Sequence, residues 1–167
     1  MPHPISALGA FHTIASLVPL GAGLYGFIRY RKIDSGTQSG KVYLAGLAVS
    51  VFTSFALSSN GGFNAGHALG ILALLAISGA LSVSRISVLG RARPYLSQFG
   101  FTFSFFLLLV PGINETLTRL PVAHPLADGP ESDIVRGTLA AWLGIFVLGS
   151  ALQFWRIRSQ RRSARPV

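Results

Sequence analysis

Long apolar runs without charge, separated by short charged segments, restrict the fold of this chain more than any other feature. Half of the 167 residues are hydrophobic and 11% are charged, against about 25% charged residues in a typical soluble domain. About twenty apolar residues suffice to cross the hydrocarbon core of a bilayer as an α-helix. The runs predict an all-α integral membrane bundle of five transmembrane helices. The predicted spans are about 5–28, 42–57, 65–83, 95–110 and 134–154.

The predicted spans form one transmembrane domain over residues 1–155, followed by a basic tail at 156–167. In the fourth run phenylalanines alternate with other residues, but the run continues at spanning length, which favours helix over strand. Pro111 and Gly112 are expected to bend or end that helix. The longest loop is then expected over about 113–133, and the tail is expected to be mobile.

The positions of the basic residues predict the orientation. A net charge of +9 would suggest a nucleic-acid partner in a soluble protein. Here the basic residues lie at the ends of apolar runs, so we expect no nucleic acid and a lipid bilayer as the partner. The positive-inside rule then predicts an outer N-terminus and a cytoplasmic C-terminus, in a bacterial inner membrane. Twelve of the fourteen basic residues fall on the predicted inner side: Arg29, Arg31, Lys32, Lys41, Arg85, Arg91, Arg93, Arg156, Arg158, Arg161, Arg162 and Arg165.

Two histidines are expected at the same depth on separate helices. His12 precedes Arg29 by 17 residues, and His67 precedes Arg85 by 18. At ~1.5 Å per residue, both lie about 25–27 Å from the cytoplasmic charges, close to the outer edge of the hydrocarbon. Because an ionisable residue in a membrane span is rare, both are candidates for a functional site.

Several kinds of site are compatible with these residues. Two neutral imidazoles facing each other could bind a b-type haem or a divalent metal ion. Glu115 and Asn64 belong to the same outer end, and a carboxylate could complete a metal site. A histidine and a carboxylate could instead anchor a quinone head group or relay a proton. In the simplest alternative, each histidine only hydrogen-bonds a carbonyl or hydroxyl group at the end of a span. No motif indicates a catalytic residue.

Short motifs in the first half of the chain resemble a known family. They are Phe11-His12, Gly40-Lys-Val-Tyr43 and Gly62-Phe-Asn-Ala-Gly-His67. Over roughly residues 11–83 the chain resembles a widespread, uncharacterised bacterial family of multi-pass membrane proteins, catalogued as a domain of unknown function. Many members carry a further histidine in the basic loop before the Gly-x-x-Tyr element, where this chain has Thr37-Gln-Ser39. The resemblance implies functional importance for His12 and His67 but no known reaction.

Three functions remain open at this point. The first is a small membrane protein with a histidine-based site for haem, metal or quinone at the outer end, formed by His12, His67, Asn64 and Glu115. The second is a non-enzymatic accessory subunit that packs against a larger membrane complex. The third is a carrier for a small molecule or a proton. All three are more easily reconciled with a non-enzymatic protein than with an enzyme.

Overall fold

The computed structural model describes residues 7–57 and 62–163, and this part of the chain is helical without any strand. The all-α prediction is therefore confirmed for the described residues. The first two residues of the first predicted span and the last four of the tail lie outside them. The elements are α1 (Ala7–Tyr30), α2 (Gln38–Phe55), α3 (Ala65–Arg85), the 3-10 turn η1 (Ser87–Leu89), α4 (Arg93–Arg119) and α5 (Asp133–Ser163).

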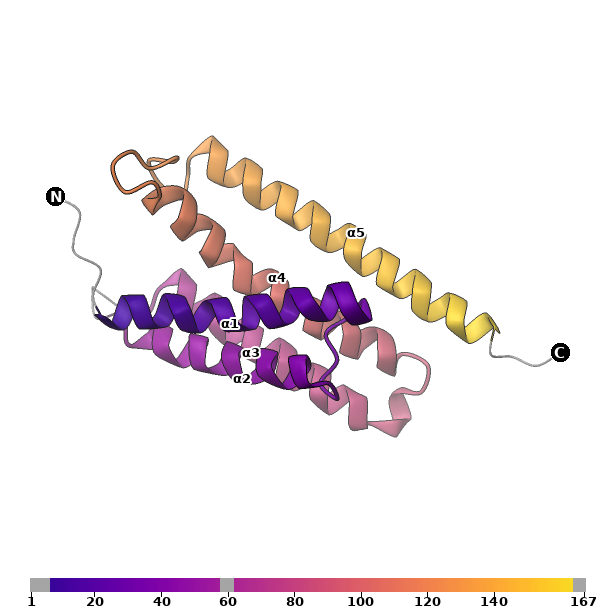
Figure 1. Ribbon diagram of the computed structural model, residues 1–167. Coiled ribbons are helices and arrows are strands. Elements are labelled where there is room, and N and C mark those ends of the chain that lie inside the picture. The colour runs from indigo at the N-terminus through magenta and orange to yellow at the C-terminus, as the bar shows by residue number, and fades with distance from the viewer. Residues whose placement is uncertain (1–6, 58–61, 164–167) are drawn as a thin grey trace.

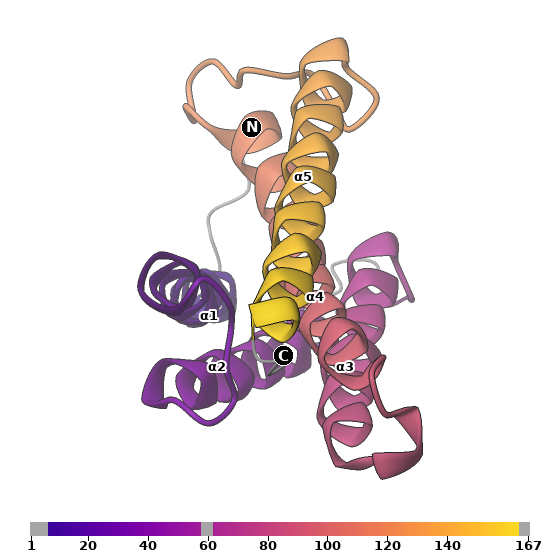
Figure 2. The ribbon, with the colours of Figure 1, turned by 90° about the vertical axis from the view of Figure 1, so that its right-hand side faces the viewer.

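Consecutive helices run antiparallel, and α4 lies near the centre of the arrangement (Figures 1 and 2). Helix α2 packs against α1 and α3, while α4 packs against α3 and α5 and touches α1. Helix α5 packs mainly on α4 and is tilted away from the first three helices (Figure 1). We call the end with residues 29–32, 85–93 and 156–162 the basic end. The opposite end, where α1 and α3 begin and α2 finishes, is called the histidine end.

In the described part of the chain, four helices are long and apolar enough to cross a membrane: α1, α3, α4 and α5. Large apolar side chains also cover outward faces of the bundle, for example Leu17, Phe52, Leu75 and Leu148. The chain therefore has the structure of a multi-pass membrane protein. The sequence predicts five spans, and four of the five described helices satisfy these criteria. Helix α2 does not, because its 18 residues include a polar first turn with Gln38, Ser39 and Lys41.

Two helices extend further than predicted. Helix α4 starts beside Pro94, as expected, but continues through Pro111 to Arg119. Of the two predicted effects of Pro111, a bend or an end, the end is wrong, and Glu115 lies on α4 rather than in a loop. Membrane helices tolerate proline because neighbouring groups and small local adjustments can satisfy the freed backbone carbonyl.

The basic tail also differs from its prediction, because α5 remains helical to Ser163. The Arg161 guanidinium donates a hydrogen bond to the Arg91 carbonyl oxygen at 2.8 Å. It also lies 5.5 Å from the centre of the Tyr95 ring, a favourable cation–π distance. These contacts hold the end of α5 against the start of α4.

A tight loop joins α1 to α2. The Asp34 carboxylate accepts a hydrogen bond from the Gly36 amide at 2.9 Å and pairs with Lys32 at 2.8 Å, and these contacts lower the pKa of Asp34. Thr37 caps α2, because its hydroxyl oxygen accepts from the Gly40 amide at 3.1 Å. A Cβ atom on Gly40 would lie 1.8 Å from the Asp34 carbonyl oxygen. Position 40 therefore requires glycine.

Buried polar side chains link the helices across the core. The Tyr43 hydroxyl donates to Ser104 Oγ at 2.7 Å, since the Ser104 proton goes to a carbonyl oxygen of its own helix. The Thr102 hydroxyl donates to Gln153 Oε1 at 2.8 Å and so joins α4 to α5. Gln153 Nε2 in turn donates to the Arg31 carbonyl oxygen at 3.4 Å. In an apolar environment such bonds replace water as partners of groups that are costly to leave unpaired.

Candidate functional site

His67 caps the start of α3 with its own side chain. Asn64 is the N-cap residue, and its Oδ1 atom accepts from the His67 amide at 3.0 Å. His67 Nδ1 accepts in return from the Asn64 amide at 3.3 Å. This reciprocal pair is a capping box in which an imidazole takes the place usually held by Glu or Gln. A residue proposed to contact a ligand, Asn64, therefore has a structural role here.

The capping bond determines where the proton of the neutral His67 ring lies. Because Nδ1 is an acceptor, the proton belongs on Nε2. Nε2 then donates to the Ser54 carbonyl oxygen in the last turn of α2, at 3.0 Å. The ring is stacked on Phe55 with centroids 4.7 Å apart, lies 5.8 Å from the Phe63 ring, and is only 4% exposed. His67 thus joins α3 to α2 with both ring nitrogens hydrogen-bonded.

His12 joins α1 to the same turn of α2. Its Nδ1 atom is 2.9 Å from the Thr53 hydroxyl oxygen, and its Nε2 atom is 3.5 Å from the Ser16 hydroxyl oxygen. Ser16 is in turn 2.7 Å from the Ser50 hydroxyl oxygen. The result is a polar seam between α1 and α2, formed by one imidazole and three hydroxyl groups.

The two histidines lie at one level but on different helix interfaces. Thr53 and Ser54 are consecutive residues of α2, so His12 and His67 reach the same turn from α1 and from α3. This agrees with the matched depth expected from the sequence. Among the described residues, no hydrogen bond or ring contact joins the two imidazoles. A ligand shared by both rings would first have to displace these bonds to α2.

Glu115 makes no hydrogen bond or ion pair with either histidine among the described residues, although its charge acts on His12 through space. Its carboxylate pairs with Arg119, one turn later on α4, at 2.5 Å, and both side chains are exposed. In residues 7–57 and 62–163, no group of three or more histidine or acidic side chains lies close enough to hold a metal ion. The structure therefore brings together His67 and Asn64, connects His12 to them through α2, and places Glu115 in a surface ion pair whose carboxylate also acts on His12.

The partners of the histidines were not identified from the sequence. A signal for them existed, because Ser50, Thr53 and Ser54 follow the i, i+3, i+4 spacing that places side chains on one side of a helix. That spacing indicates a polar stripe on an otherwise apolar helix. It does not indicate which neighbouring helix carries the complementary group.

Comparisons of the chain with protein-family models, with curated proteins and with solved structures find no match. The resemblance to the bacterial membrane family stays a prediction. Function is therefore argued from the contacts of the residues themselves.

Proposed function

We propose that this protein is a non-enzymatic accessory subunit of a bacterial inner membrane, which packs against a larger membrane-protein partner. One observation carries the proposal: the side chains best suited to chemistry at the histidine end hold helices together. His67 uses both ring nitrogens within the chain and is buried. His12 is hydrogen-bonded within the α1–α2 seam. Polar groups that are hydrogen-bonded within the chain stabilise the helix bundle and leave few donor atoms for a substrate.

Helix α2 is the fifth span in this proposal. Its 18 residues are about 27 Å long, close to the ~30 Å thickness of the hydrocarbon core. Its last turn contacts His12 near the start of α1, and its first turn contacts the loop that follows α1. It therefore runs alongside α1 from His12 to the end of that helix, and α1 is apolar enough to cross by itself. Lys41 in the first turn can extend its ammonium group to the head-group region.

The orientation in this proposal follows from the charges at the two ends. The basic end gathers the arginines that close α1, α3 and α5. The positive-inside rule places such an end in the cytoplasm. The histidine end, with Glu115 and the acidic residues before α5, then faces the periplasm.

The outward face of α5 supports the partner assignment. Gly137 and Gly144 are exposed, and a Cβ atom on either would meet nothing within 4 Å. Ala141 lies between them on the same helix face. Small residues at this spacing allow another transmembrane helix to approach closely. An apolar partner helix is therefore the occupant expected here.

Purification in a mild detergent with cross-linking tests the proposal. We expect a defined complex that survives His12→Ala and is lost in Gly144→Leu. Gly21→Leu serves as the control, because position 21 on α1 is also exposed with open space around it. Loss of the complex in the control and Gly144→Leu alike would count against α5 as the partner face, and a strictly monomeric protein would contradict the proposal.

A histidine-based cofactor site is the second candidate. The observation that favours it is the approach of both histidines to one turn of α2. The spectrum and metal content of gently purified protein test it directly. A Soret band or stoichiometric metal that disappears in both His12→Ala and His67→Ala would establish the cofactor site and displace the accessory-subunit proposal.

A further inference from the structure

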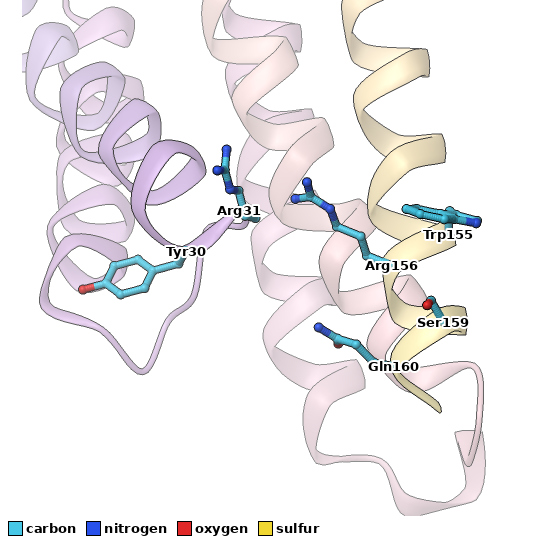
Figure 3. Close-up of a pocket in the computed structure, with 6 residues that line it drawn as sticks. All are labelled: Tyr30, Arg31, Trp155, Arg156, Ser159 and Gln160. Atoms are coloured by element: carbon cyan, nitrogen blue, oxygen red, sulfur yellow. The ribbon is translucent and has the colours of Figure 1, made fainter. Parts of the chain in front are cut away.

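A cavity of about 410 Å³, shallow and open to the surface, lies at the basic end between the end of α1 and the last turns of α5. All the residues that line it are exposed. Figure 3 shows the Arg156 side chain extending from α5 toward Arg31. The lining residues are Tyr30, Arg31, Trp155, Arg156, Ser159 and Gln160.

Two of the lining residues, Arg31 and Arg156, are arginines. Among the described residues, neither the Arg31 nor the Arg156 guanidinium takes part in an ion pair or a hydrogen bond. The two cations, both exposed, repel each other, and an anion between them offsets that repulsion. Guanidinium groups bind phosphate and carboxylate through paired N–H donors. The charge in the cavity thus indicates an anionic ligand.

The other lining residues indicate where in the bilayer this ligand lies. Tyr30 is the last residue of α1, Trp155 lies about two turns before the end of α5, and both are exposed aromatic residues. Tryptophan and tyrosine are enriched at the level of lipid head groups. Ser159 and Gln160 add hydroxyl and amide donors one turn further along α5. The cavity therefore combines the charge, the polarity and the depth of a head-group site.

An apolar track leads away from the cavity along the half of α5 nearer the basic end, on the face that carries Gly137 and Gly144 further along the helix. Leu148, Leu152, Trp155 and Ser159 follow a spacing that keeps them on one face of the helix. Leu148 is 67% exposed and Leu152 is 58% exposed. A free phosphate ion would make no apolar contact with this track, whereas an acyl chain can pack along it. The track thus favours a lipid over a soluble anion.

We propose that the basic end binds an anionic phospholipid, with its phosphate between Arg31 and Arg156 and an acyl chain along Leu148 and Leu152. A second cavity of about 240 Å³ adjoins the first and shares Trp155 and Ser159 with it. Its further lining residues, Arg158 and Arg162, raise the positive potential around the head group. Basic cavities between membrane helices on the cytoplasmic side are known to hold anionic lipid head groups.

Native mass spectrometry of the full chain in detergent tests this proposal with dioleoyl phosphatidylglycerol, dioleoyl phosphatidylcholine and inorganic phosphate as separate probes. We expect phosphatidylglycerol to bind with defined stoichiometry and phosphatidylcholine to bind at least several-fold more weakly. Inorganic phosphate at the same concentration should not displace the lipid. The double variant Arg31→Gln/Arg156→Gln should weaken phosphatidylglycerol binding roughly ten- to thirtyfold, since each arginine near an anionic head group contributes severalfold.

The matched control is Arg85→Gln/Arg91→Gln, which removes the same charge from the same end of the bundle but outside the cavity. It should retain phosphatidylglycerol within about twofold. Circular dichroism and melting of both double variants check that the bundle remains folded. An equal loss in both variants would show unspecific charge attraction and overturn the site. Displacement of the lipid by inorganic phosphate, or unchanged binding in Arg31→Gln/Arg156→Gln, would overturn it as well.

Discussion

Replacement of His67 by phenylalanine distinguishes between two roles of this residue, holding helices together and binding a ligand. Phenylalanine keeps an aromatic ring of similar size against Phe55 but removes both hydrogen bonds, to the Asn64 amide and to the Ser54 carbonyl oxygen. Each such bond contributes about 0.5–1.5 kcal/mol to stability. His67→Phe should therefore lower the free energy of unfolding by about 1–3 kcal/mol. His67→Ala also removes the buried ring, and its cost should rise to about 3–5 kcal/mol.

Unfolding in detergent micelles, followed by circular dichroism against temperature or denaturant, measures these differences. His124→Ala is the control, because His124 is exposed in the segment between α4 and α5 and should change the free energy by less than about 0.5 kcal/mol. If His67→Phe unfolds like the unaltered protein, the hydrogen bonds are not what His67 contributes. If haem or a divalent metal stabilises the unaltered protein and His67→Phe abolishes that effect, the ring nitrogens are ligands. The interpretation that His67 only holds helices together is then refuted.

Four further substitutions test the packing and the loop. Gly100→Ala places a Cβ atom 2.8 Å from a backbone carbonyl oxygen of α3 and should cost about 1–3 kcal/mol, whereas Gly112→Ala on the same helix meets nothing within 4 Å and should be neutral or gain up to about 1 kcal/mol; equal melting temperatures would contradict this. Tyr43→Phe removes a buried hydroxyl bond and should lower stability by about 0.5–1.5 kcal/mol in the same unfolding assay. The Lys32 contact lowers the pKa of Asp34, so its contribution is present above about pH 4 and is lost as the pH falls through the lowered pKa; Asp34→Asn should flatten this acid limb in melting curves from pH 7 to pH 3.

The helices were predictable because their signals are local. An uncharged apolar run is a property of neighbouring residues, and α3 begins at Ala65 as expected from the polar turn before it. Pro94 likewise starts α4. The continuation of α4 through Pro111 was not predictable in this way, because the rule that proline ends a helix describes chains in water. In the packed bundle the adjoining turns and helices outweigh the single lost backbone bond.

The candidate site was predictable in depth but not in its contacts. Counting residues from Arg29 and Arg85 placed His12 and His67 at one level, because helical rise is constant. The partners Thr53 and Ser54 depend on which helices become neighbours and on how they are rotated, and residue counting contains neither. The cavity around Arg31 and Arg156 was missed for a related reason. The positive-inside rule already explained both arginines as cytoplasmic charges. Only the packing of α5 near the end of α1 shows that they line the same cavity.

The polar first turn of α2 has a consequence for the biogenesis of the protein. A translocon releases a helix into lipid according to its apolarity, and charged or amide side chains raise the cost of release. Helix α2 is the segment that falls short of the apolarity of the other four. The tight loop to α1 and the hydrogen bonds to His12 and His67 can offset the low apolarity of α2 only once α1 and α3 are present. We therefore expect α1 and α2 to enter the bilayer together as a helical hairpin, which α3 completes after its synthesis.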